Sequence, residues 1–174
     1  MEMYESERIA YRSITLDDTQ KVLRWRNCDE VRKNFFYQSV ITPKEHEEYY
    51  NTRVRSGEVR QFVMKDKETD TEFGCVYFSH VNIEKKTAEG GLFIGDSLYR
   101  GKGYGTEAYK WLKEFGFFYL GITTIYLRIR KENLVSVNSA SKAGFKIDQK
   151  LTDEYYVNGG AEDLVFLSIY RNEN

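Results

Sequence analysis

Three glycines at alternate positions, Gly101, Gly103 and Gly105, are the feature that most constrains how this chain folds. They follow a β-type run that ends at Ile94, and they precede a stretch, 106–119, whose apolar residues have helical spacing. Glycine allows positive φ and close approach to a ligand, and the free N–H groups of a helix N-terminus favour an anion such as pyrophosphate. The segment is therefore a phosphate-binding loop or a plain glycine-rich turn.

Two other phosphate-binding motifs do not fit this segment. A dinucleotide fingerprint requires glycine where Thr106 stands, and it requires an acidic residue about 20 positions after the loop, where 121–126 has none. A P-loop requires Gly-Lys-Ser/Thr after a four-residue gap, which 101–106 does not provide. The sequence therefore argues against a nicotinamide cofactor and against a P-loop nucleotide.

Strand-like and helix-like segments alternate along the rest of the chain. We expect strands over 9–14, 61–65, 73–81, 87–94, 124–129, 149–157 and 162–170, and helices over 15–25, 42–57, 106–119 and 133–143. The run Asn158-Gly159-Gly160 indicates a hairpin between the last two strands. The order β-α-α-β-β-β-α-β-α-β-β predicts an α/β fold.

Size, charge and cysteine usage exclude several classes of function. The length of 174 residues fits one domain, over residues 1–174, and 41% hydrophobic residues supply a core. A net charge of −1 gives no field for nucleic acid or an anionic membrane, so neither is an expected partner. No signal peptide or 18-residue apolar run is present, which favours a cytoplasmic protein. Two cysteines and two histidines offer no disulfide framework and no metal site.

The residues around the glycines resemble the GNAT superfamily of N-acetyltransferases. The pattern Arg100-x-x-Gly103-x-Gly105 after a strand is similar to the acetyl-CoA loop of that superfamily, Gln/Arg-x-x-Gly-x-Gly/Ala. The flanking segments that are also similar are Ala88-Glu89-x-Gly91-x-x-Ile94-Gly95-Asp96, Thr106-Glu107-Ala108, Glu132-Asn133 and Lys142-Ala143-Gly144-Phe145. The resemblance spans nearly the whole chain. It implies an acyltransferase that moves the acetyl group of acetyl-CoA, its co-substrate, to an amine, without a metal.

The resemblance also implies a fold and a set of cofactor-binding residues. The fold is a single-domain mixed sheet, mostly antiparallel, with flanking helices; its adjacent parallel strands 87–94 and 124–129 splay apart and expose backbone groups to the pantetheine arm. The implied cofactor-binding residues are Leu92, Phe93, Ile94, Arg100, Gly101, Lys102, Gly103, Tyr104, Gly105, Thr106 and Asn133. For the loop and for Asn133, the alternative reading is an ordinary turn and helix cap.

The implied mechanism is direct transfer in a ternary complex, so neither cysteine is required as a nucleophile. A backbone N–H near 92–94 would hold the oxyanion. Glu89 is similar to the carboxylate that acts as a base in several branches; alternatively, it is a surface residue paired with Lys85 or Lys86.

Many relatives carry a tyrosine that protonates the thiolate, but here Ala140 stands at that position. Because a thiol pKa is about 8.5, we expect slower transfer rather than none. Candidates to replace that acid are Ser139, Ser141 and Tyr155.

The acceptor is the least constrained part of the prediction. The segments 22–27 and 41–46 look like those of enzymes that acetylate a nucleotide-linked amino sugar, as in pseudaminic-acid assembly. Residues 21–60 contain nine basic and six acidic side chains, which favours an anionic acceptor over a polyamine. Arg24 or Arg26 is then expected near the diphosphate of this acceptor, and Trp25 or Phe36 near its aromatic nucleobase. Alternatively, Trp25 is a core residue and the arginines lie on the surface.

Three other readings stay open for the function. The chain could acetylate protein N-termini, of the ribosomal-protein type, or polyamines. It could instead bind acetyl-CoA without turnover, which would suit the missing tyrosine. A homodimer also stays open as its oligomeric state.

Overall fold

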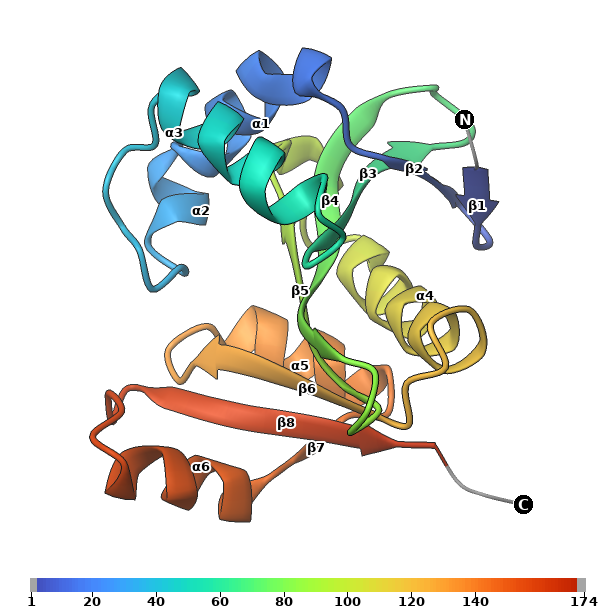
Figure 1. Ribbon diagram of the computed structural model, residues 1–174. Helices are drawn as coiled ribbons and strands as arrows, with labels where there is room; N and C mark the ends of the chain where they lie inside the picture. Colours follow the sequence, from blue (N-terminus) through green and yellow to red (C-terminus); the bar gives the residue numbers. More distant parts are fainter. Residues whose placement is uncertain (1–2, 172–174) are drawn as a thin grey trace.

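The computed structural model describes residues 3–171 (Figure 1). Its strands form one sheet in the order β1-β2-β3-β4-β5-β6-β8-β7. The strands are β1 (Met3–Glu5), β2 (Ile9–Ser13), β3 (Arg60–Asp66), β4 (Glu72–Asn82), β5 (Thr87–Ile94), β6 (Thr124–Arg130), β7 (Lys146–Ile147) and β8 (Leu164–Tyr170). Neighbouring strands are antiparallel except β5 and β6, which are parallel. The predicted mixed α/β sheet is confirmed.

The helices are short except for α4. They are α1 (Thr19–Arg26), α2 (Asp29–Arg32), α3 (Pro43–Tyr49), α4 (Tyr104–Phe118), α5 (Leu134–Lys142) and α6 (Gln149–Val157), with 3-10 turns at Leu16–Asp18 and Ser97–Tyr99 and a π-helical turn at Tyr50–Val54. A capping box at Thr42, with Pro43 next to it, begins α3 as predicted. The helix expected over 42–57 is therefore α3 followed by the π-helical turn.

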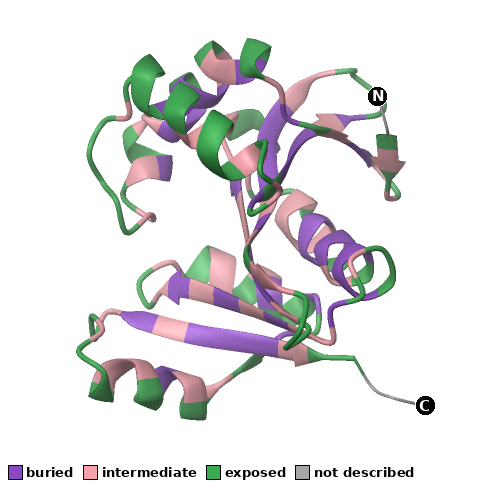
Figure 2. Cartoon of the chain, viewed as in Figure 1, coloured by how far each residue is buried: buried purple, intermediate pink, exposed green. Residues whose placement is uncertain are grey.

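The two faces of the sheet carry separate hydrophobic clusters, as the alternation of burial along the strands requires. One cluster joins the sheet to α4 through residues such as Leu112, Ile125 and Leu127. The other lies under α1 and α2 and includes Trp25 and Phe93. Figure 2 shows buried residues along the central strands and along one side of α4. Successive residues of β5 therefore face α4 and the N-terminal helices in turn.

The parallel pair β5 and β6 separates partway along its length. Its ladder runs from Thr87 opposite Thr124 to Gly90 opposite Leu127 and ends there. Beyond that point β5 continues to Ile94 against β4 alone, while β6 continues to Arg130 against β8. The splay expected between these two strands is confirmed, and it leaves one backbone edge of residues 91–94 without a strand partner.

The strand predicted over 149–157 is wrong, because these residues form α6. The Asp148 side chain accepts a hydrogen bond from the backbone N–H of Leu151, which caps the helix. The buried Thr152 fixes the helix against β8, since its Oγ1 accepts the backbone N–H of Phe166. The predicted hairpin at 158–160 is also wrong: Asn158 is the C-terminal cap of α6, and Gly159 with φ +83° ends the helix.

Candidate active site

The glycine loop connects the end of β5 to α4 and has the backbone expected of an anion-binding loop. Gly101 and Gly103 have φ of +72° and +85°, and Gly103 is the N-terminal cap of α4. The first N–H groups of a helix have no partner within it, so those of residues 104–106 are available to a ligand. Gly105 does not have positive φ, so of the three glycines only Gly101 and Gly103 use the left-handed conformation. The nearest atom to a Cβ at Gly105 would be Ser139 Oγ, at 3.6 Å.

The side chain of Arg100 is turned back toward β5. Its Nε donates to the carbonyl of Ile94 at 3.0 Å, and its Nη2 donates to the carbonyl of Gly95 at 2.8 Å. These bonds join the end of the splayed strand to the start of the loop. The guanidinium therefore braces the backbone between β5 and the loop.

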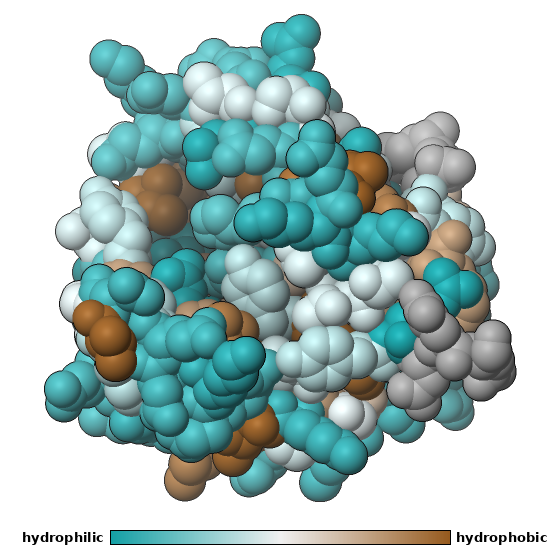
Figure 3. Space-filling view, turned by 60° about the horizontal axis from the view of Figure 1, so that its bottom comes forward, coloured by the Kyte–Doolittle hydropathy of each residue, from teal (hydrophilic) through white to brown (hydrophobic). Residues whose placement is uncertain are grey.

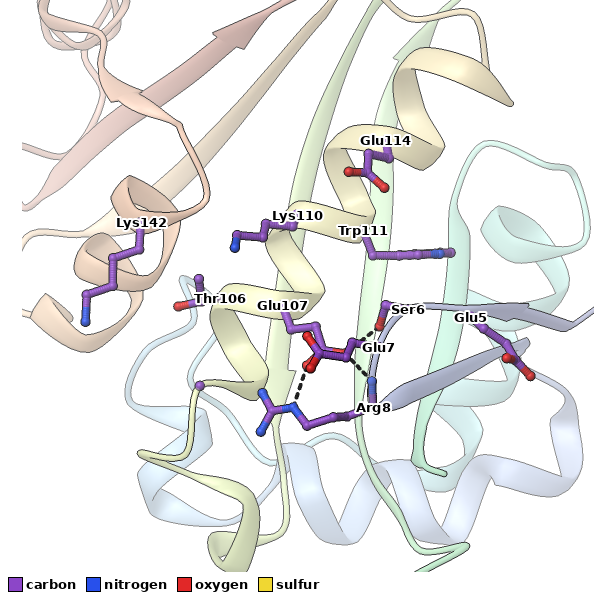
Figure 4. A pocket seen from close by; sticks show the side chains of 11 residues that line it. Glu5, Ser6, Glu7, Arg8, Thr106, Glu107, Lys110, Trp111, Glu114 and Lys142 are labelled. Carbon is purple, nitrogen blue, oxygen red and sulfur yellow. Dashed lines mark hydrogen bonds and ion pairs between the residues drawn. The ribbon is translucent and has the colours of Figure 1, made fainter. Parts of the chain in front are cut away.

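A surface pocket of about 510 Å³ lies beside the loop (Figure 4). Thr106 and Lys142 line this pocket, as do Lys110 and Trp111 of α4. Arg8 borders it from the N-terminal segment: its Nε binds Glu107 Oε2 at 2.7 Å, and its Nη1 donates to the carbonyl of Lys102 at 3.1 Å.

Tyr104 points away from the loop, and its hydroxyl donates to Asp66 at the end of β3. That hydrogen bond raises the pKa of Tyr104 to about 12, so the hydroxyl is protonated at neutral pH. Asp66 also accepts the backbone N–H of Thr69 at 2.8 Å. Together with the Arg8 contacts, these bonds attach the loop and the start of α4 to the N-terminal segment and to the end of β3.

Glu89 lies on β5 next to the last paired residue, on the face that carries the N-terminal helices. It is 9% exposed. Its Oε1 accepts from Nε of Arg128 at 3.2 Å, and its Oε2 lies 3.1 Å from Nδ1 of His80. The ion pair with Lys85 or Lys86, which the alternative reading required, is not formed; both lysines are exposed. His80 and Arg128 were not predicted from the sequence, because their contacts with Glu89 depend on a β-bulge and on the splay.

The predicted acceptor residues separate into two groups. Phe36 is 43% exposed, and the guanidinium of Arg128 lies 4.3 Å from the centre of its ring, so Phe36 borders the site around Glu89. Arg24 is exposed on α1, and no interaction places it at this site. The expectation that Trp25 stacks on a nucleobase is wrong. Trp25 is 5% exposed and lies in the core, so close to Gly95 that a Cβ there would clash with its ring.

Arg26 is also buried, contrary both to the expectation that it binds a diphosphate and to the alternative that it is a surface residue. It is 7% exposed, and its guanidinium stacks 3.4 Å from the ring centre of Phe35. Nη2 donates to the carbonyl of Tyr37 at 2.8 Å, whereas Nη1 has no hydrogen-bond partner within residues 3–171. Burial lowers the pKa of Arg26, although the group stays charged. The arginine ties the segment after α2 to the core.

The remaining predicted cofactor residues lie where β5, β6 and α5 meet. Leu92 and Ile94 pack against the cluster under α4, while Phe93 packs edge-to-face on Phe35. Asn133 caps α5, and its Oδ1 accepts from the backbone N–H of Ser136 at 3.2 Å. Its side-chain oxygen therefore has the capping role of the alternative reading.

Ala140 is fully buried, so the position of the missing tyrosine is filled by core packing. Within the part of the chain that the structure describes, no group of three or more His, Cys, Asp or Glu is placed to hold a metal ion. None of the helices in that part is long and apolar enough to span a membrane.

Comparison with curated proteins identifies relatives along the whole chain. Spermidine N(1)-acetyltransferase of Escherichia coli (strain K12) is 26% identical over 172 residues, covering 98% of this chain and 90% of the relative. Spermidine N(1)-acetyltransferase of Vibrio cholerae is 23% identical over 168 residues, covering 97% and 96%.

Solved structures share the fold. The spermidine N-acetyltransferase from Vibrio cholerae in complex with CoA and spermine superposes with a TM-score of 0.82 at 23% identity, over 95% of this chain and 97% of the other. A domain from Methanocaldococcus jannaschii gives 0.79 at 21% identity, over 95% and 99%. The model of the acetyltransferase (GNAT) domain family matches residues 8–146, which span the glycine loop and the splayed strands. The chain belongs to the GNAT acetyltransferase family and is an acetyl-CoA-dependent N-acetyltransferase.

Proposed function

We propose that acetyl transfer takes place where β5 and β6 separate. The end of their ladder at Gly90 and Leu127 carries this proposal, because it leaves backbone N–H and C=O groups without a strand partner. Residues 92–94 would pair with the amides of the pantetheine arm, and one N–H among them would bind the oxyanion. The pyrophosphate would lie on the main-chain N–H groups of residues 101–106.

We propose that Glu89 accepts a proton from the acceptor amine. Three features support this role: it adjoins the point where the ladder ends, it is nearly buried, and its carboxylate faces His80 and Arg128 rather than a surface lysine. Holding amine and thioester together supplies much of the rate enhancement.

With Ala140 in place of a tyrosine, the thiolate leaves without a tyrosine that acts as general acid. Of the candidates to replace that acid, Ser139 lies beside Gly105 of the loop.

For the acceptor, we propose a polyamine. The support comes from the relatives of E. coli and V. cholerae, which are spermidine N(1)-acetyltransferases and align over nearly the whole chain. The structure also weakens the case for our first expectation, the nucleotide-linked amino sugar, because two of its four proposed contacts, Trp25 and Arg26, are buried.

The nucleotide-linked amino sugar is kept as a second candidate because of the charge around the site. Arg128 pairs with Glu89 and stacks on the half-exposed Phe36, so an aromatic ring and a cation border the place where the acceptor would bind. A cation beside an aromatic ring suits an anionic acceptor better than a polycation.

One experiment distinguishes the acceptors. The protein is incubated with acetyl-CoA and, in separate reactions, with spermidine, a UDP-linked amino sugar, the same sugar without nucleotide, and a peptide with a free N-terminus; products are identified by mass spectrometry. Acetylated spermidine as the main product supports the proposal. A preference for the UDP-linked sugar would overturn the polyamine assignment, and acetylated peptide would overturn both.

We also propose that the enzyme self-associates. One relative, the spermidine N-acetyltransferase from Vibrio cholerae, has been solved as a dodecamer. On the face of this chain shown in Figure 3, hydrophobic side chains are scattered among hydrophilic ones rather than gathered in one patch. Light scattering coupled to size-exclusion chromatography measures the mass directly; a single monomeric mass at every concentration would contradict the proposal.

A further inference from the structure

We propose that His80 carries the proton from Glu89 to solvent during acetyl transfer. This inference rests on the proposed role of Glu89 as the base. Glu89 is 9% exposed, and its two oxygens face Arg128 Nε at 3.2 Å and His80 Nδ1 at 3.1 Å. Arginine stays protonated in proteins and cannot relay a proton, whereas histidine exchanges protons near neutral pH.

The backbone places His80 beside Glu89 through a bulge in β4. Ser79 pairs with Glu89 and Asn82 pairs with Thr87, so two residues of β4 lie opposite one residue of β5. In a regular strand, the residue after Ser79 would point to the opposite face of the sheet. The bulge, with His80 at φ +49°, turns the imidazole back onto the face of Glu89. Left-handed backbone at a non-glycine residue is uncommon, and such residues concentrate at functional sites.

The exposure of the two side chains fits the direction of transfer. The Glu89 side chain is 11% exposed, and that of His80 is 57% exposed. A proton received on the carboxylate therefore passes to Nδ1, and the imidazole releases a proton from Nε2 to water. The other titratable or charged groups around Glu89 are Arg128 and Tyr126 on β6 and Tyr77 on β4, and burial raises the pKa of both tyrosines. Both phenols are therefore protonated at neutral pH.

The relay satisfies the proton balance of the reaction. An alkylammonium acceptor has three N–H protons, and the amide product keeps one. As the N–C bond forms and the C–S bond breaks, one proton ends on the thiolate sulfur and one must leave the site. Glu89 takes the departing proton and His80 passes it to solvent. The exposed imidazole then returns to the tautomer with a free Nδ1 by exchanging protons with water, which prepares the relay for the next turnover.

The test uses His80→Asn and the best acceptor of the panel above. Asparagine tolerates left-handed backbone but does not titrate. We expect kcat to fall at least tenfold with KM values for acetyl-CoA and acceptor unchanged, and free imidazole in the buffer to restore part of the loss. His80→Gly, which has no strain at φ +49°, should lose kcat equally and respond more strongly to imidazole. Lys86→Asn is the matched control: Lys86 is exposed in the same hairpin with φ +52°, and its variant should keep wild-type kcat.

Two results would overturn the relay. One is wild-type kcat in both His80 variants while Glu89→Gln is impaired. Glu89 would then act as the base without passing its proton to His80. The other is a loss of kcat that imidazole does not restore in either variant, which indicates a structural role. Wild-type kcat in Glu89→Gln is a different outcome. It would show that Glu89 is not the base, and it would contradict that part of the proposed function as well as the relay.

Discussion

At the scale of single residues, burial and partners decide which polar side chains can act. Arg26 and Glu89 were both candidates from the sequence. Arg26 is buried against Phe35 and has no carboxylate partner in residues 3–171, so it holds a segment of chain. Glu89 is nearly buried too, yet it adjoins the unpaired edge of β5 and contacts His80. Sequence position alone does not distinguish these two situations.

Replacing Glu89 with glutamine keeps the size of the side chain and removes its basicity. We expect kcat to fall by about 10² while the Kd for acetyl-CoA stays within about twofold, because general bases contribute at this level and the carboxylate does not contact the loop. Thiol release measures kcat, and calorimetry measures Kd. Glu84→Gln, at an exposed position in the same hairpin, is the control. Wild-type kcat for Glu89→Gln between about pH 6 and 9 would contradict the assignment.

At the scale of elements, local signals located most helices and strands, and tertiary contacts decided the others. The capping box at Thr42 and the amphipathic spacing of α4 were readable because they lie within one segment. The segment 149–157 contains tyrosines and a valine that favour strands, but Asp148 caps it as a helix. β8 already pairs with β6 along its whole length, and on its other side it pairs with only the two residues of β7. Pairing across the sheet is not visible in a single segment.

The contact between α3 and α1 gives a prediction for pH dependence. His46 of α3 is 5% exposed; its Nδ1 lies 3.1 Å from Thr19 Oγ1, and Nε2 has no hydrogen-bond partner within residues 3–171. Burial lowers its pKa from 6.5. As the pH falls, His46 therefore binds a proton in the unfolded chain before it does so in the folded chain. The stabilisation of the folded state by neutral His46 is fully present above about pH 6.5 and is lost as the pH falls through the lowered pKa.

We therefore expect the contribution of His46 to the free energy of unfolding to fall by up to about 1.4 kcal/mol per pH unit below about pH 6.5. Urea unfolding followed by circular dichroism between about pH 7.5 and 5.5 measures this slope. The slope should be smaller in His46→Gln, and the exposed neighbour Glu47→Gln should keep it. Equal slopes in wild type and His46→Gln would show that His46 is not the group responsible.

At the scale of the whole molecule, the parallel pair in the centre of the sheet positions every part of the site. β5 carries Glu89 and leads into the glycine loop, while β6 carries Arg128 and leads to α5 (Figure 1). The loop, the splay and the position of Glu89 followed from the sequence through its resemblance to one superfamily. The brace of Arg100 and the bulge at His80 did not, and the sequence left open whether Trp25 stacks on a ligand or lies in the core, because each depends on contacts between distant segments.

The loop as the acetyl-CoA site is the central claim, and calorimetry of acetyl-CoA binding tests it most directly. Gly103→Val is compared with Gly121→Val; the two glycines have φ of +85° and +67°, and Gly121 lies beyond α4 with open space around it. Both variants carry similar backbone strain, but only the first alters the anion-binding loop. We predict at least a tenfold weaker Kd for Gly103→Val, the effect of losing a charged hydrogen bond, and wild-type Kd for Gly121→Val. Wild-type affinity in Gly103→Val would contradict the account.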